Sequence, residues 1–303
     1  MFKLEDLTGV LPALISPLRS GGSVDEAAVG RLVEHVIKGG VKGMLALGST
    51  GETASLDETA RRALLSSVVA AAAGRVPVIC GVAQSHLAAA RVEVDAAAHL
   101  GAVAALVAPP FYYLIDQPTV LAFYRKLAED SPIPILLYNI PQYTKVVAEP
   151  STVATLAREG TIAGIKDSSR DFEYFEGICI ATRDLPAFRV FTGSDTMLLP
   201  SLTMGGAGTI CGAANVAPHW VVRIFEAFQR RDMVAARDAQ DELYQLVMVL
   251  RGGVFPAAIK AACHQQGLCE PWCAAPVPPL DERMEARLRD RLEAWGLLGA
   301  LTA

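Results

Sequence analysis

The sequence has no long uninterrupted apolar run, no dense block of basic residues and no two cysteines separated by two other residues (CxxC). Its most apolar stretches, residues 63–74 and 103–115, contain serines or prolines and are too short to span a membrane. A formal net charge of −5 without a Lys/Arg cluster argues against nucleic-acid binding. The first ten residues carry two acids and lack the apolar segment of a secretory signal, so we expect a cytoplasmic protein.

The six cysteines do not have the spacing of a structural metal site. Cys263, Cys269 and Cys273 lie near His264, but the CxxC pair typical of zinc ligands is missing. The other three cysteines lie in apolar segments, where reduced cysteine packs as a small hydrophobic side chain. We therefore predict no metal, while the role of the three clustered cysteines stays open.

Short apolar runs alternate with amphipathic stretches over most of the 303 residues, of which 52% are hydrophobic and 19% charged. The runs read as buried parallel strands, because they show little alternation and are bounded by Gly, Pro or Ser. The stretches between them read as helices, with capping boxes at residues 23–26 and 55–58. The predicted strands are residues 10–16, 43–47, 76–82, 102–108, 133–138, 162–166, 188–192 and 208–211.

Eight strand–helix units within about 230 residues predict an α/β protein with a (β/α)8 TIM barrel. A doubly wound open sheet is the alternative, but the first predicted strand is not followed by its glycine fingerprint. Beyond residue 230 the strand pattern stops, and residues 235–249 and 281–298 read as helices. We therefore predict a barrel over residues 1–230 and a helical region over residues 231–303 that packs on it.

The most distinctive short motifs follow the predicted strands at their carboxyl ends, where barrels of this kind build their active sites. A lysine at such an end, Lys166, could form a Schiff base with a ketone, unless it extends outward to solvent. The loop GSTGE at 48–52 offers hydroxyls and amides for a small carboxylate, unless it is only a tight turn. Tyr138 could transfer protons, although a core tyrosine bound to backbone is the alternative.

Five motifs together resemble the dihydrodipicolinate synthase / N-acetylneuraminate lyase family of class I pyruvate-dependent aldolases. They are GSTGE at 48–52, PFYY at 110–113, YNIP at 138–141, GIKD at 164–167 and GSD at 193–195. The resemblance extends to the helical carboxyl-terminal region through AAIKAACHQQGL and PVPPLD. It implies a barrel, usually a homotetramer, that condenses or cleaves 2-oxo acids through a pyruvate imine without a cofactor.

Carried onto this chain, the resemblance implies a role for each motif residue. Lys166 becomes the Schiff-base lysine, and Tyr138 becomes the general acid and base. Ser49 and Thr50 hold the substrate carboxylate, and Ser49 also relays protons. Tyr112 matches a tyrosine that a neighbouring subunit lends to this relay in the synthases. The expected substrate-binding set also contains Gly193, Asp195 and Ile210.

Departures from the family motifs bear on the substrate. Dihydrodipicolinate synthases have an arginine two residues after YN(V/I)P that pairs with the aldehyde's carboxylate, and here Tyr143 takes that place. Sialic-acid lyases have an acidic residue and a serine where this chain has Thr196 and Gly212. These features favour a 2-keto-3-deoxy sugar-acid aldolase or dehydratase. The alternatives are a dihydrodipicolinate synthase and a non-catalytic module that binds 2-oxo acids.

Overall fold

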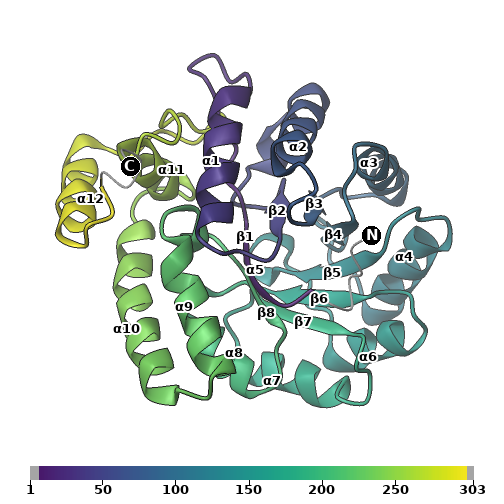
Figure 1. Cartoon of the computed structure of the whole chain (residues 1–303). Coiled ribbons are helices and arrows are strands. Elements are labelled where there is room, and N and C mark those ends of the chain that lie inside the picture. Colours follow the sequence, from purple (N-terminus) through teal and green to yellow (C-terminus); the bar gives the residue numbers. More distant parts are fainter. Residues whose placement is uncertain (1–6, 299–303) are drawn as a thin grey trace.

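Eight parallel strands form the centre of the structure, a computed structural model that describes residues 7–298. They are hydrogen-bonded in the order β1-β8-β7-β6-β5-β4-β3-β2, and a parallel bridge between Ala13 and Leu45 joins β1 to β2 (Figure 1). The strands are β1 (Gly9–Pro12), β2 (Met44–Ala46), β3 (Val78–Val82), β4 (Ala104–Val107), β5 (Ile135–Asn139), β6 (Gly164–Asp167), β7 (Arg189–Thr192) and β8 (Gly208–Cys211). The predicted (β/α)8 barrel is confirmed.

Helices surround the barrel, and each strand is followed by at least one of them (Figure 1). The helices of the eight units are α1 (Glu26–Lys38), α2 (Glu58–Ala72), α3 (Leu87–His99), α4 (Gln117–Glu129), α5 (Pro141–Thr144), α6 (Pro150–Arg158), α7 (Phe172–Ala181), α8 (Leu198–Thr203) and α9 (Pro218–Gln229). Three short 3-10 turns, η2 (Thr53–Ser55), η3 (Asp195–Met197) and η4 (Ala213–Asn215), lie in loops that follow β2, β7 and β8. Among residues 7–298, no helix has the length and apolar character that a membrane crossing needs.

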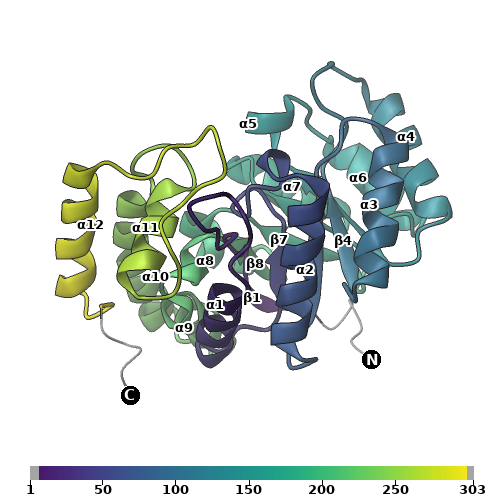
Figure 2. The ribbon, with the colours of Figure 1, turned by 90° about the horizontal axis from the view of Figure 1, so that it is seen from above.

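Three further helices, α10 (Met233–Leu250), α11 (Ala257–Gln265) and α12 (Glu282–Ala294), follow the eighth unit. They lie together on one side of the barrel, and α10 packs against α9 (Figure 2). The sequence pattern had predicted two helices here and missed α11. The division of the chain at residue 230 stays a prediction.

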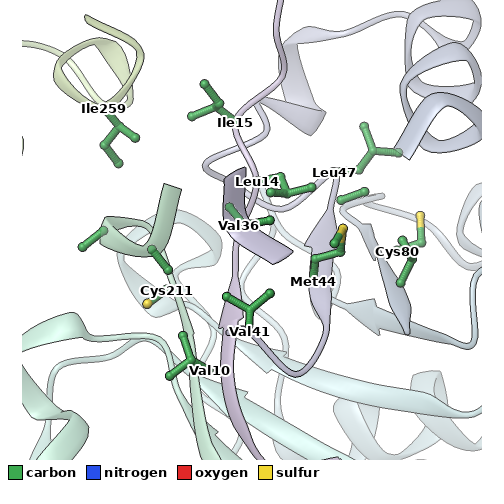
Figure 3. Close-up of a cluster of buried hydrophobic side chains, with 14 of the residues drawn as sticks. Val10, Leu14, Ile15, Val36, Val41, Met44, Leu47, Cys80, Cys211 and Ile259 are labelled. Atoms are coloured by element: carbon green, nitrogen blue, oxygen red, sulfur yellow. The ribbon is translucent and has the colours of Figure 1, made fainter. Parts of the chain in front are cut away.

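Hydrophobic side chains fill two layers. One lies inside the barrel and includes Leu45, Leu106 and Phe191. The other lies between the strands and the helices, where Val36 of α1 packs near Met44 of β2 (Figure 3). Because both faces of the sheet are buried, the strands show near-continuous apolar runs rather than alternation.

Both predicted capping boxes are wrong by two residues. The cap of α1 is Asp25, whose carboxylate accepts a hydrogen bond from the amide of Ala28, and Ser23 does not cap the helix. In α2 the corresponding residue is Asp57, which accepts from the amide of Ala60 at 2.8 Å. A carboxylate caps a helix as well as a hydroxyl does and also stabilises the positive end of its dipole, which explains the later start.

Candidate active site

Lys166 lies near the carboxyl end of β6 with only 3% of its surface exposed, so its amine does not extend to solvent. The register of the barrel pairs Lys166 with Tyr138 on β5. Because paired residues of parallel strands point to the same face, both side chains enter the barrel mouth. The lysine Nζ lies 3.5 Å from the Tyr138 Oη and 4.6 Å from the centre of its ring.

A hydroxyl from a second strand end reaches the same phenol. The Oγ of Ser49, in the loop after β2, lies 3.3 Å from the Tyr138 Oη, and either oxygen can donate. Ser49, Tyr138 and Lys166 therefore form a row of hydroxyl, phenol and amine. Such a row can pass a proton to and from a reacting group beside the amine.

The loop at residues 48–52 is held in a tight conformation beside this row. The amide of Gly51 donates to the carbonyl of Gly48 at 3.0 Å, and the carbonyl of Gly51 accepts from the Ser16 hydroxyl at 2.6 Å. Thr50 is buried in the loop, and Glu52 has a left-handed φ of 55°. The loop therefore presents the hydroxyls of Ser49 and Thr50 at fixed positions in the cavity.

A buried ion pair that the sequence analysis missed anchors this loop to the carboxyl-terminal helices. Glu52 pairs with Lys260 of α11, and their side chains are 3% and 0% exposed. The Oε1 of Glu52 accepts from the amide of Ala274 at 2.7 Å, and the Nζ of Lys260 donates to the carbonyl of Trp272 at 2.6 Å. The only sequence signal is a lone lysine in an otherwise apolar stretch of α11.

The strand-seven motif forms the opposite wall. A Cβ on Gly193 would overlap the Ser168 Oγ and lie 2.8 Å from the Lys166 Cε, so a side chain here would displace the serine hydroxyl and the lysine stem. Asp195 is fixed by the amide of Ala213, which donates to its Oδ1 at 2.8 Å. Ser168 and Asp195 thus line the cavity on the side of β6 and β7.

Asp167, the residue after the lysine, points elsewhere. Its Oδ1 accepts from the Asn139 side-chain amide at 2.8 Å, and its Oδ2 accepts from the Ser169 hydroxyl at 2.9 Å. Burial raises the pKa of Asp167 from its ordinary value, and the hydrogen bonds from Asn139 and Ser169 oppose this shift. Asp167 therefore ties the ends of β5 and β6 together.

A cavity of about 350 Å³ joins these walls. It brings together seven of the eight predicted site residues: Ser49, Thr50, Tyr138, Lys166, Gly193, Asp195 and Ile210. The sequence analysis did not include the residues of α10 and of the loops around it that complete the lining, among them Leu250, Arg251 and Phe255. Their positions depend on how α10 packs, which no local motif reveals.

Tyr112, the eighth predicted residue, does not reach this cavity within the chain. It is 86% exposed, has a left-handed φ of 84°, and packs edge-to-face on Tyr113 with ring centres 5.0 Å apart. Leu114 beside them is equally exposed. The loop after β4 thus ends in an exposed apolar tip.

The arrangement of an amine, a phenol and a hydroxyl suits imine chemistry on a small ketone. Within residues 7–298, no group of three or more His, Cys, Asp or Glu is placed to hold a metal ion. Cys263 and Cys269 are buried, and burial raises the pKa of Cys269 to about 12. The His264 Nδ1 lies 2.9 Å from the Cys269 carbonyl oxygen, so this cluster packs α11 against its following loop.

Comparisons with known proteins identify the family to which the chain is similar. Residues 6–295 match the model of the dihydrodipicolinate synthetase family. The 4-hydroxy-tetrahydrodipicolinate synthase of Salinibacter ruber is 36% identical over 282 residues, which cover 93% of each chain. YagE of E. coli K12, a prophage protein of the same family solved in complex with pyruvate, has a TM-score of 0.92 at 27% identity, covering 96% of this chain and 99% of its own. A monomeric dihydrodipicolinate synthase variant has a TM-score of 0.93 at 28% identity, covering 96% and 98%.

Proposed function

This chain belongs to the dihydrodipicolinate synthetase family of Schiff-base-forming, class I aldolase-type lyases, and we propose that its Lys166 forms the imine with pyruvate and directs it to an aldehyde. The single observation that supports this most is the row of Ser49 Oγ, Tyr138 Oη and Lys166 Nζ in one cavity. Among residues 7–298, no other lysine lines that cavity.

In the proposed reaction the neutral amine of Lys166 attacks the C2 carbonyl of pyruvate. The carbinolamine loses its oxygen as water with a proton from the Tyr138 phenol, which leaves a protonated imine and a phenolate. The hydroxyls of Ser49 and Thr50 bind the pyruvate carboxylate. The phenolate, with Ser49 as relay, takes a C3 proton from the protonated imine and so gives an enamine. The C3 of the enamine attacks the aldehyde carbon while Tyr138 returns this proton to the aldehyde oxygen. Water, or an amine of the product, then releases the lysine.

The names of the relatives favour aspartate semialdehyde as the aldehyde, and thus synthesis of 4-hydroxy-tetrahydrodipicolinate. This was the alternative in the sequence analysis, and the relatives support it better than the 2-keto-3-deoxy sugar acid that the motifs favoured. One observation keeps the sugar acid as a second candidate. Tyr143 and Ser168 line the cavity, and their hydroxyls suit a neutral polyol chain. The non-catalytic module has no support, because the relatives carry the names of enzymes.

A second copy of the chain is part of this proposal. Tyr112 is solvent-exposed at the tip of its loop, and an apolar cavity of about 390 Å³ opens beside Ser49 and Tyr138. We expect the tip of one subunit to enter this cavity of its neighbour and to place its phenol in the relay. A homotetramer, as the resemblance implies, would contain such pairs.

Turnover assays separate the two candidate substrates. Incubation with pyruvate and aspartate semialdehyde should consume pyruvate, and a Lys166→Met variant should consume none. A Lys126→Met variant, which changes an exposed lysine of α4 outside the cavity, should keep the wild-type rate. Inertness toward the semialdehyde together with pyruvate release from 2-keto-3-deoxygluconate would reject the first candidate in favour of the second.

A further inference from the structure

Two arginines lie in the outer part of the catalytic cavity. Arg170 follows the lysine strand, and Arg251 caps the carboxyl end of α10; both line the same cavity as Lys166. Both arginines are exposed, whereas Lys166 is buried. The cavity therefore runs from a buried amine to a rim that carries two guanidinium groups.

Neither of these two guanidinium groups has a salt-bridge partner in the described part of the chain. Other arginines do, for example Arg125 with Glu159. Of the acids in the described part of the chain, only Asp195 lies in the cavity wall, and one of its oxygens already accepts from the Ala213 amide. With Lys166 the wall thus has three basic groups against one acid, in a chain of net charge −5.

The electrostatic fields of both arginines reach into the cavity. Burial, reinforced by the charge of Arg170, lowers the pKa of Arg251, and Asp195 opposes this shift. Burial raises the pKa of Tyr143, and the charge of Arg170 opposes that shift. The positive charge of Arg170 therefore interacts with Arg251 and with Tyr143 in the cavity wall.

The backbone at Arg170 is held firmly. The Ser169 amide donates to Asp167 Oδ1 at 3.1 Å, and the Asp171 amide donates to the Ser169 Oγ at 3.1 Å. Arg170 itself has a left-handed φ of 64°. Its Cα is thus placed at the cavity rim by hydrogen bonds on both sides in the chain.

We propose that Arg170 and Arg251 form a subsite that binds the distal carboxylate of the second substrate. A carboxylate between two guanidinium groups removes their repulsion and accepts charge-assisted hydrogen bonds from both. This inference rests on the proposed imine at Lys166. It selects aldehydes that end in a carboxylate over those that end in a hydroxyl or a methyl group.

Imine trapping measures this subsite without turnover. The protein is incubated separately with pyruvate, with the diacids 2-oxoadipate and 2-oxopimelate, and with the methyl-ended acids of the same chain length, 2-oxohexanoate and 2-oxoheptanoate. Each imine is then reduced with borohydride. We expect half-maximal trapping at about tenfold to a hundredfold lower concentration for the diacids than for the methyl-ended acids. Arg170→Met and Arg251→Met should each remove most of this preference, Arg251→Lys should keep part of it, and Arg183→Met, outside the cavity, should keep all of it.

The outcomes separate the two proposals. If pyruvate leaves no adduct on folded protein, the imine at Lys166 is wrong and the subsite falls with it. If pyruvate is trapped but diacids and methyl-ended acids trap equally well, only the subsite is overturned. Equal preference for diacids in wild type and in the Arg170→Met/Arg251→Met double variant overturns it too. Since both side chains are exposed, we expect these variants to fold.

Discussion

Replacing Lys260 by methionine removes one half of the buried ion pair that anchors the loop at residues 48–52. Glu52 keeps its hydrogen bond from the Ala274 amide but loses its counter-charge, and the Trp272 carbonyl loses its donor. Both side chains of the pair are almost completely buried, so water cannot replace the missing ammonium. An unpaired buried charge of this kind costs about 3–5 kcal/mol of unfolding free energy.

The double variant Glu52→Gln/Lys260→Met tests whether the charge is the cause. Glutamine can still accept from the Ala274 amide, and neither charge of the pair is left. What remains is the unpartnered Trp272 carbonyl, at about 1–3 kcal/mol. The double variant should therefore be more stable than Lys260→Met alone, although it carries one change more.

Urea unfolding followed by far-UV circular dichroism measures these free energies from the midpoint and the slope. Lys126→Met, at an exposed lysine of α4, should stay within about 0.5 kcal/mol of wild type. A Lys260→Met variant that unfolds within about 1 kcal/mol of wild type would refute the reasoning. The free energy of unfolding of the single variant Glu52→Gln is measured in the same way. A double variant whose unfolding free energy falls by the sum of the losses in Glu52→Gln and in Lys260→Met would refute the reasoning equally.

Three further predictions concern the site and the pH dependence. Tyr138→Phe should lower kcat by about 10²–10⁴-fold in pyruvate consumption assays, while borohydride still traps the imine; an unchanged kcat would exclude the phenol from proton transfer. Gly193→Ala should weaken pyruvate trapping because its methyl group overlaps the Lys166 stem, whereas Gly30→Ala on the exposed side of α1 should leave trapping unchanged. Burial lowers the folded-state pKa of His35 below its ordinary value of 6.5. The contribution of neutral His35 to the free energy of unfolding is therefore complete above pH 6.5, and it is lost as the pH falls through the lowered pKa. His35→Gln should therefore flatten the fall in urea midpoint between about pH 7.5 and about pH 5.5, and an unchanged slope would contradict this.

Local patterns were sufficient to predict the barrel and most of its active-site wall. Strands buried on both faces must be apolar throughout, and the motifs after them must meet at one rim. That is why Ser49, Tyr138 and Lys166 could be placed together before any distance was known. Their hydrogen-bond contacts depend on the register of β5 against β6, which the sequence does not show.

The site residues that the sequence pattern missed are positioned by contacts between distant parts of the chain. Glu52 and Lys260 are 208 positions apart, and their pairing depends on where α11 packs on the barrel. Arg251 enters the cavity for a similar reason, because α10 packs against α9 and η3. The capping errors have a different cause, since Asp25 and Ser23 are both good caps and only the local backbone decides between them.

The most direct test of this account is peptide mass spectrometry of protein that has been reduced with borohydride in the presence of pyruvate. The account predicts one reduced pyruvate adduct, on the peptide that contains Lys166, and none in a Lys166→Met variant. An adduct on another lysine, or no adduct on the folded protein, would contradict it.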